Sequence, residues 1–295
     1  MSVEESNAPP ENTVRYKLTV AYDGTDFHGW QKQEPIDPDA PDPAPGEEPK
    51  RLQLRTVQHI VEQAVRETIR EPVNVLGASR TDSGVHALGQ VCAFTSIPDD
   101  TKGVGWPIER GTETLVRALN SKLPRDVLVT NATTVPLDFN PIGGAIEKEY
   151  CYTMVSGPVR PLWDRRTVFH TWYPLDTALM QRAAAHLVGE HDFASFAQIA
   201  HGRKTTVRTV FGCTVHEHPT EPGRVEIRIS GSGFLYNMVR IVAGTLMEVG
   251  RGKMDPDAIP EIIASCDRTK AGPTLPPQGL RLEWIRYANE EHATA

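Results

Sequence analysis

Apolar and polar residues alternate along the segment V-R-Y-K-L-T-V-A-Y, from Val14 to Tyr22. A two-residue period is typical of a β-strand with one buried face. Farther along, apolar residues recur at helical spacing between Val57 and Ile69, and Thr56 occupies the position expected for an N-cap. The pattern therefore predicts a strand followed by an amphipathic helix.

The rest of the chain also mixes strands with helices. The pattern predicts strands at 73–78, 90–95, 127–135, 149–155, 207–217, 225–230 and 282–287, and helices at 112–123, 177–188, 236–249 and 256–266. Because strands and helices do not alternate one for one, mainly antiparallel sheet is favoured over a doubly wound parallel sheet. We therefore predict an α+β fold with two similar α/β halves. The predicted divisions are a tail at 1–12, halves at 13–142 and 143–288, and a tail at 289–295.

The segment between the first strand and the helix is rich in proline and acid. Residues 34–50 include six prolines among 17 residues. Proline lacks a backbone N–H, and the segment has too few apolar residues to bury a core. It is predicted to be an exposed, extended insert within the first half.

The formal charge of −7 at first argues against a nucleic-acid partner. The acidity is unevenly distributed, however, because residues 1–12, 34–50 and 289–295 together carry −10. The remaining chain therefore carries +3. A mildly basic body with acidic appendages is compatible with RNA binding.

The four cysteines, at positions 92, 151, 213 and 266, form no C-x-x-C pair. Scattered free thiols fit a reducing compartment. The N-terminus has no signal-peptide pattern, and no run approaches the roughly 18 apolar residues that span a bilayer. The sequence predicts a cytoplasmic protein without a membrane association.

The most informative stretch is G-A-S-R-T-D-S-G-V-H-A-L-G-Q-V, from Gly77 to Val91. It places Asp82 on a loop between two apolar strands, with its carboxylate facing outward. Local chemistry is satisfied by an Asx turn in which Gly84 has a positive φ. Arg80 places a cation beside the carboxylate, and turn chemistry alone does not explain that pair. The stretch therefore indicates a functional site around Asp82.

This motif, together with Y-D-G-T-D-F-H-G-W-Q at 22–31, resembles the tRNA pseudouridine synthase A family. Five further blocks follow in the family's order. They are L-N-S-K-L-P at 119–124, E-K-E-Y-C-Y at 147–152, G-E-H-D-F-A-S-F at 189–196, F-L-Y-N-M-V-R-I-V-A-G-T-L-M-E-V-G at 234–250, and D-R-T-K-A-G-P-T-L-P-P-Q-G-L at 267–280. The similarity runs from about residue 16 to residue 287.

The resemblance implies an isomerase that converts uridine to pseudouridine at positions 38, 39 and 40 of the tRNA anticodon stem-loop. It implies the pseudouridine synthase fold, with two sheets joined across a central cleft, and a homodimer. Asp82 is implied as the catalytic residue, acting on a flipped-out uridine. The reaction needs a base or nucleophile and a closed pocket, but no cofactor and no metal. Attack on the sugar, attack on the base and removal of a ribose proton all remain open.

Arg240 lies in the apolar segment M-V-R-I-V-A-G. Periodicity alone leaves two interpretations open, a cation snorkelling at a helix edge or one meeting a buried acid. The resemblance implies the second, with Arg240 paired to Asp82. Such a pair would keep Asp82 ionised despite its desolvation.

Three further site residues follow from the resemblance. A strand tyrosine such as Tyr150 ordinarily packs within the sheet, but the resemblance implies that it lines the active site against the target base. Arg80 is implied to help hold the extruded nucleotide, and Lys148 to bind substrate. The segment F-N-P-I-G-G-A departs from the family, because Ile142 stands where an arginine is usual.

Other observations leave alternatives open. A group of basic residues in or near loops is either a solvated face or a set of phosphate contacts: Arg160, Arg165, Arg166, Arg203, Lys204 and Arg208. Three rival functions also remain, namely a noncatalytic RNA-binding module, a synthase acting on other RNA positions and a metal-dependent hydrolase.

Overall fold

The computed structural model describes residues 9–41, 43, 46–198 and 205–288. Within them, hydrogen-bonded strands follow the order β4-β1-β3-β10-β5-β9-β8-β7, with β2 paired to β3 and β6 paired to β5. The pairs β1–β4, β2–β3, β5–β10, β5–β9, β8–β9 and β7–β8 are antiparallel, whereas the pairs β3–β10 and β5–β6 are parallel. The predicted α+β class with mainly antiparallel sheet is confirmed.

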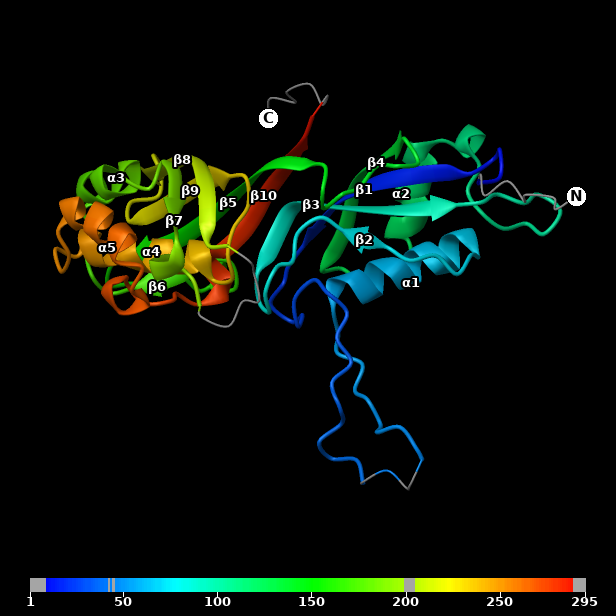
Figure 1. Ribbon diagram of the computed structural model, residues 1–295, viewed down its shortest axis with the longest axis horizontal. Helices are drawn as coiled ribbons and strands as arrows, with labels where there is room; N and C mark the ends of the chain where they lie inside the picture. Colours follow the sequence, from blue (N-terminus) through cyan, green and yellow to red (C-terminus); the bar gives the residue numbers. More distant parts are fainter. Residues whose placement is uncertain (1–8, 42, 44–45, 199–204, 289–295) are drawn as a thin grey trace, which may run out of the picture. The chain divides into compact units, whose positions relative to one another are not determined.

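The chain forms two compact units (Figure 1). The first contains residues up to 22, residues 27–80 and residues 90–144; the second contains residues 23–26, residues 81–89 and the chain from 145 onward. The loop that carries Asp82 was expected in the first half, but the structure groups it with the second unit. The reason is long-range pairing, because Arg281 and Leu282 pair in parallel with His86 and Ala87.

The first unit has the predicted strand and helix at its beginning. Its elements are β1 (Val14–Tyr22), α1 (Val57–Ile69), β2 (Leu76–Gly77), the later part of β3 (His86–Ser96), α2 (Thr112–Asn120) and β4 (Val127–Val135). The inward residues of β1, among them Leu18, are fully buried and its antiparallel partner is β4. Thr56 is the N-cap residue of α1, as predicted, although its buried hydroxyl makes no hydrogen bond among the described residues.

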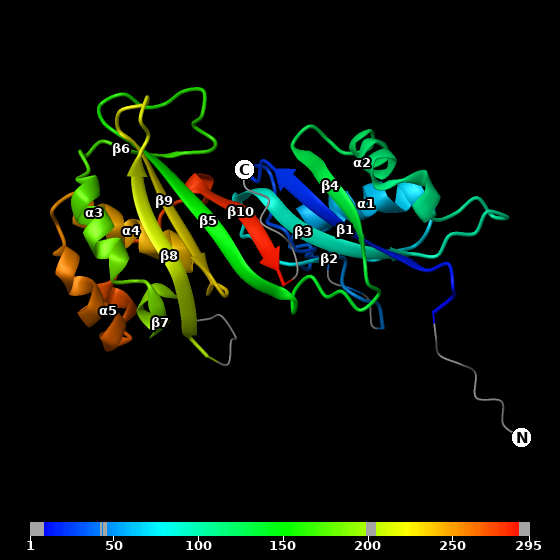
Figure 2. The same cartoon turned by 90° about the horizontal axis from the view of Figure 1, so that it is seen from above.

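The second unit packs its helices against one face of a sheet. Figure 2 shows α3, α4 and α5 gathered on one side of strands β5, β8 and β9. The elements are β5 (Ala145–Ser156), β6 (Phe169–Thr171), α3 (Thr177–Ala185), β7 (Gly189–Asp192), β8 (Val207–Glu217), β9 (Arg224–Gly231), α4 (Met238–Gly250), α5 (Ile259–Ser265) and β10 (Leu280–Tyr287). Along β9, buried Val225, Ile227 and Ile229 alternate with polar residues. One of these polar residues, Arg228, pairs with Glu149 of the neighbouring strand.

Helix α4 is the core element of this unit, since nearly all of its residues are buried. Burial of 11 of its 13 residues needs a largely apolar sequence on every side of the helix. The sequence M-V-R-I-V-A-G-T-L-M-E-V-G supplies it, apart from Arg240 and Glu248. No helix in the described ranges is long and apolar enough to cross a bilayer.

The proline-rich insert is closed at its base. Ile36 and Arg51 form an isolated antiparallel bridge, and the Asp37 N–H donates to the Lys50 carbonyl at 2.8 Å. Beyond this base, the described residues of the insert are mostly exposed, and Figure 1 shows the loop extending away from the helix α1 that follows it. The insert is thus an appendage whose ends are held together by backbone hydrogen bonds.

We expect deletion of residues 34–50 to strengthen nonspecific RNA binding, because it removes −5 of formal charge from the chain. The dependence of affinity on salt should also become steeper, since acidic repulsion would no longer offset phosphate contacts. Filter binding of unrelated RNA across salt concentrations measures both effects. A charge-only variant, Glu47→Gln with Glu48→Gln, should shift affinity in the same direction. Unchanged binding in both variants would contradict the prediction.

Candidate active site in the second unit

The Asp82 loop connects β2 with β3 and closes in a tight turn. The Val85 N–H donates to the Asp82 carbonyl at 3.1 Å, and Gly84 has a φ of +78°. A Cβ at position 84 would lie 2.8 Å from Cγ of Pro277. Glycine is therefore required twice, for the backbone angle and for the close approach to Pro277.

The carboxylate of Asp82 is partly withdrawn from water. Burial raises its pKa above the ordinary value, and the positive charge of Arg240 acts in the opposite direction. Burial is the larger of the two influences. The charge of Arg240 therefore opposes the effect of burial on the Asp82 pKa without cancelling it.

Arg240 is held in the first turn of α4. Its Nε donates to the Leu275 carbonyl at 2.6 Å, and its Nη1 donates to Oδ1 of Asn237 at 2.7 Å. Asn237 precedes the helix with a φ of +61°, a left-handed conformation that asparagine tolerates better than most residues. Among the described residues, no nitrogen–oxygen contact of 4.0 Å or less joins Arg240 to Asp82. Arg240 therefore influences Asp82 through its charge at longer range, and not as a hydrogen-bonded ion pair.

Residues 272–279, here called the connecting segment, join the elements of the site. The Gly272 N–H donates to Oγ1 of Thr245 in α4 at 2.9 Å, and Leu275 accepts from Arg240. The Tyr152 hydroxyl of β5 donates to the Pro276 carbonyl at 2.9 Å. One short segment thus contacts α4, β5 and, through Pro277, the Asp82 loop.

Tyr152 shares the electrostatic environment of Arg240. Burial raises the pKa of its hydroxyl, and the Arg240 charge opposes that rise. The charge of Arg240 therefore reaches both the Asp82 carboxyl and the Tyr152 phenol. The structure brings these three side chains together around the connecting segment.

Tyr150 and Lys148 lie on the same face of β5 as Tyr152, because alternate residues of a strand point the same way. Tyr150 is 7% exposed, and its ring meets Phe234 edge-on with centroids 5.3 Å apart. Lys148 is half-buried. Tyr150 is therefore packed against the loop between β9 and α4, and it shares its strand face with Tyr152.

Arg80 is exposed and closes the 27–80 segment of the first unit. It precedes Asp82 by two residues and belongs to the first unit, whereas Asp82 belongs to the second. Sequence reasoning missed Asn237, Tyr152 and the connecting segment. Asparagine immediately before an apolar helix was the available signal for Asn237, and P-T-L-P-P-Q-G marked an irregular segment.

The basic residues near loops have different partners. Arg160 and Arg165 are exposed, whereas Arg166 forms ion pairs with Asp23 and Asp26. Arg208 donates to backbone carbonyls next to it, and Arg203 and Lys204 lie outside the described residues. Ile142, where the family usually has arginine, is 55% exposed.

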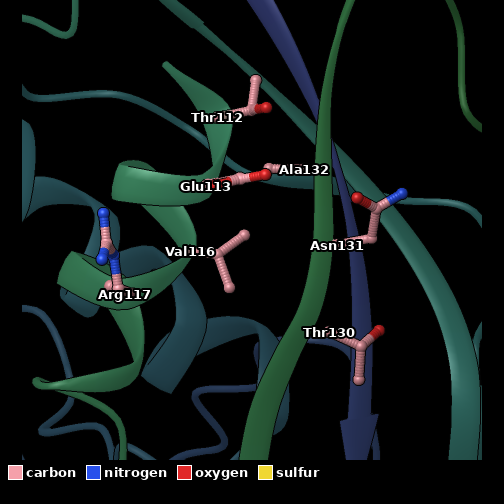
Figure 3. Close-up of a pocket in the computed structure, with 7 residues that line it drawn as sticks. All are labelled: Thr112, Glu113, Val116, Arg117, Thr130, Asn131 and Ala132. Atoms are coloured by element: carbon pink, nitrogen blue, oxygen red, sulfur yellow. The ribbon is translucent and has the colours of Figure 1, made fainter. Parts of the chain in front are cut away.

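A shallow hollow between α2 and β4 lies apart from these residues in the first unit (Figure 3). Its lining is contributed by Thr112, Glu113, Val116, Arg117, Thr130, Asn131 and Ala132. It contains none of the predicted site residues. Within the described ranges, no group of three or more His, Cys, Asp or Glu residues is arranged to hold a metal ion.

Comparison with known proteins shows the family. The model of a family described as tRNA pseudouridine synthase matches residues 47–142 and 183–288. The chain belongs to the tRNA pseudouridine synthase family. The members of this family are isomerases that convert uridine to pseudouridine.

Curated relatives match this chain over nearly its whole length. It is 39% identical over 274 residues to "tRNA pseudouridine synthase A 2" of Clostridium perfringens, covering 92% of this chain and 98% of the relative. It is 40% identical to proteins named "tRNA pseudouridine synthase A" of Geotalea uraniireducens, over 271 residues, and Caldicellulosiruptor saccharolyticus, over 273. Both matches cover 92% of this chain and 98% of the relative.

Proposed function

We propose that the protein isomerises uridine to pseudouridine at positions 38, 39 and 40 of the tRNA anticodon stem-loop, with Asp82 as the catalytic residue. The supporting observation is the environment of Asp82. A carboxyl whose pKa is raised by burial, beside a fixed guanidinium, is typical of a functional acid, base or nucleophile. It lies in the R-T-D-S-G-V-H segment by which the chain resembles the family.

The roles proposed for the neighbouring residues rest on the family resemblance, and for Arg240 also on its charge near Asp82. Arg240 limits the rise in the Asp82 pKa and so keeps more of the carboxylate ionised. Tyr150 would present its ring to the target base, Lys148 would contact substrate from the same strand face, and Arg80 would hold the extruded nucleotide. Flipping a base out of the helix costs a few kcal/mol. A planar cation or aromatic ring that stacks on the extruded base, or fills the space the base leaves, offsets part of that cost.

The positions are tested with unmodified tRNA transcripts that carry uridine at only one of residues 38, 39 and 40. We expect pseudouridine at each of these positions and at no other uridine of the same transcript. Chemical mapping of pseudouridine after incubation with the protein measures this. Modification confined to uridines outside the anticodon stem-loop would instead support a synthase with another target. Tight tRNA binding without any modification would support a noncatalytic RNA-binding module.

The family resemblance also supports a cytoplasmic homodimer. Light scattering should then give twice the chain mass of 32.6 kDa. A mass equal to one chain at micromolar concentration would contradict the dimer.

A further inference from the structure

His86 ends the R-T-D-S-G-V-H motif and begins β3, four residues after Asp82. Its side chain is buried, with 3% of the residue exposed. Buried histidines are costly unless their polar atoms have partners. The contacts of this imidazole therefore indicate what it does.

The Nδ1 atom of His86 accepts a hydrogen bond from the Gly24 N–H at 3.0 Å. A ring nitrogen that accepts carries no proton, so the imidazole is neutral with its proton on Nε2. Burial, the largest influence, lowers the pKa of His86, which also favours the neutral form. The contact depends on glycine, because a Cβ at position 24 would lie 1.9 Å from the Val85 carbonyl oxygen.

The charged and polar groups around the ring come from several elements. Oδ1 of Asp23 lies 3.3 Å from Nδ1 and is itself fixed by the N–H and hydroxyl of Thr25. The backbone of Arg166 and of Gln278 favours the protonated imidazole, and the charge of Arg281 disfavours it. At ordinary hydrogen-bond geometry, Nε2 has no partner among the described residues.

These contacts connect His86 to both sides of the Asp82 loop. Residues 23–26 precede the loop by more than fifty positions but belong to the same unit. Gln278 belongs to the connecting segment, which also contacts Gly84 through Pro277 and Arg240 through Leu275. His86 thus lies at the end of the Asp82 loop, where that loop meets residues 23–26 and the connecting segment.

We propose that His86 is a positioning residue, whose neutral Nδ1 fixes the end of the Asp82 loop on the Gly24 N–H and thereby orients the Asp82 carboxylate beside Arg240. The inference rests on the proposed function of Asp82. It assigns His86 no contact with substrate. A displacement of about 1 Å in a reacting group can lower a rate about 100-fold, so the loss of this anchor is measurable as kcat.

The test uses two variants of matched shape. Asparagine and leucine have nearly the same outline, but only asparagine retains an acceptor where Nδ1 lies. We expect His86→Leu to lower kcat for pseudouridine formation about 10-fold to 100-fold, with KM for tRNA changed less than about threefold. His86→Asn should recover most of the lost kcat. If His86→Leu does not fold, His86→Gln replaces it, since glutamine carries its acceptor one bond farther out.

The outcomes separate this proposal from the one on which it rests. Equal kcat losses in the two variants, with parallel falls in Tm, would show that His86 only fills space and would overturn the positioning role. Wild-type kcat in both variants would overturn it as well. Absence of pseudouridine formation by the wild-type protein, by contrast, would overturn the proposed function.

Discussion

The Asp82→Asn variant is expected to lose pseudouridine formation by at least about 1000-fold while melting at a higher temperature than the wild type at pH 7. Asparagine keeps the shape of the side chain but can serve neither as a base nor as a carboxylate nucleophile. It also removes a charge that the site partly buries. The same residue should therefore limit stability and support activity, as is common at functional sites.

The sign of the stability effect follows from the direction of the pKa. Because the folded-state pKa of Asp82 is raised above the ordinary aspartate value of 3.8, the folded protein binds more protons than the unfolded chain between these two pKa values. Stability attributable to this group is then present below pH 3.8 and is lost as pH rises through the folded pKa. The advantage of Asp82→Asn in Tm should be largest near neutral pH and should shrink as the pH is lowered toward 3.8.

Thermal melts across pH, with single-turnover assays, measure both effects. Asp267→Asn is a suitable control, because the pKa of Asp267 is lowered by hydrogen bonds to Thr269 and the group lies on another loop. Its pH-dependent effect on Tm should have the opposite sign, and its activity should be unchanged. A lower Tm for Asp82→Asn at pH 7 would contradict the account of a carboxylate strained by burial.

The Arg240→Ala variant is expected to lower the rate about 100-fold or more and to destabilise the fold. Removal of the guanidinium leaves the Asn237 Oδ1 and the Leu275 carbonyl without their donor. Each buried group left unpaired costs about 1–3 kcal/mol. Loss of the positive charge should also raise the pKa of Asp82 further. In a plot of reaction rate against pH, the acidic limb, where the rate rises as Asp82 ionises, should therefore move to higher pH.

Two controls separate charge from packing. Arg240→Lys keeps a cation but cannot reproduce both hydrogen bonds, so it should lose stability while retaining more of the wild-type acidic limb. Arg251→Ala removes the arginine at the other end of α4, which bonds to Glu248 and lies over the Tyr173 ring. It should lower Tm without moving the acidic limb. An unshifted acidic limb in Arg240→Ala would contradict the electrostatic role of Arg240.

Local patterns predicted most of the secondary structure. Strands β1, β4 and β8 have the predicted bounds, and in β1 buried and half-buried residues alternate from Tyr16 to Tyr22. The predicted strand at 73–78 contracts to two residues, Leu76 and Gly77. Strands β6 and β7 were not predicted, since three or four residues are too few to show a period.

The candidate site was only partly predictable, because its geometry depends on contacts distant in sequence. The R-T-D-S-G-V-H motif pointed to Asp82, whereas periodicity left the role of Arg240 open and only the family resemblance indicated it. The assignment of residues 23–26 and 81–89 to the second unit depends on parallel pairing with β10 and on the Gly24–His86 contact. No local pattern encodes such pairings, and the same is true of the connecting segment that joins Arg240 to the Asp82 loop.

The most direct test of the central claim is tritium release from tRNA labelled with 5-tritiated uridine, measured for wild type and Asp82→Asn side by side. Pseudouridine formation replaces the hydrogen at C5, so the wild type should release one tritium for each modified uridine, including in excess EDTA. Asp82→Asn should still bind tRNA and release almost none. Undiminished release by Asp82→Asn, or no release by the wild type on any tRNA, would contradict the account.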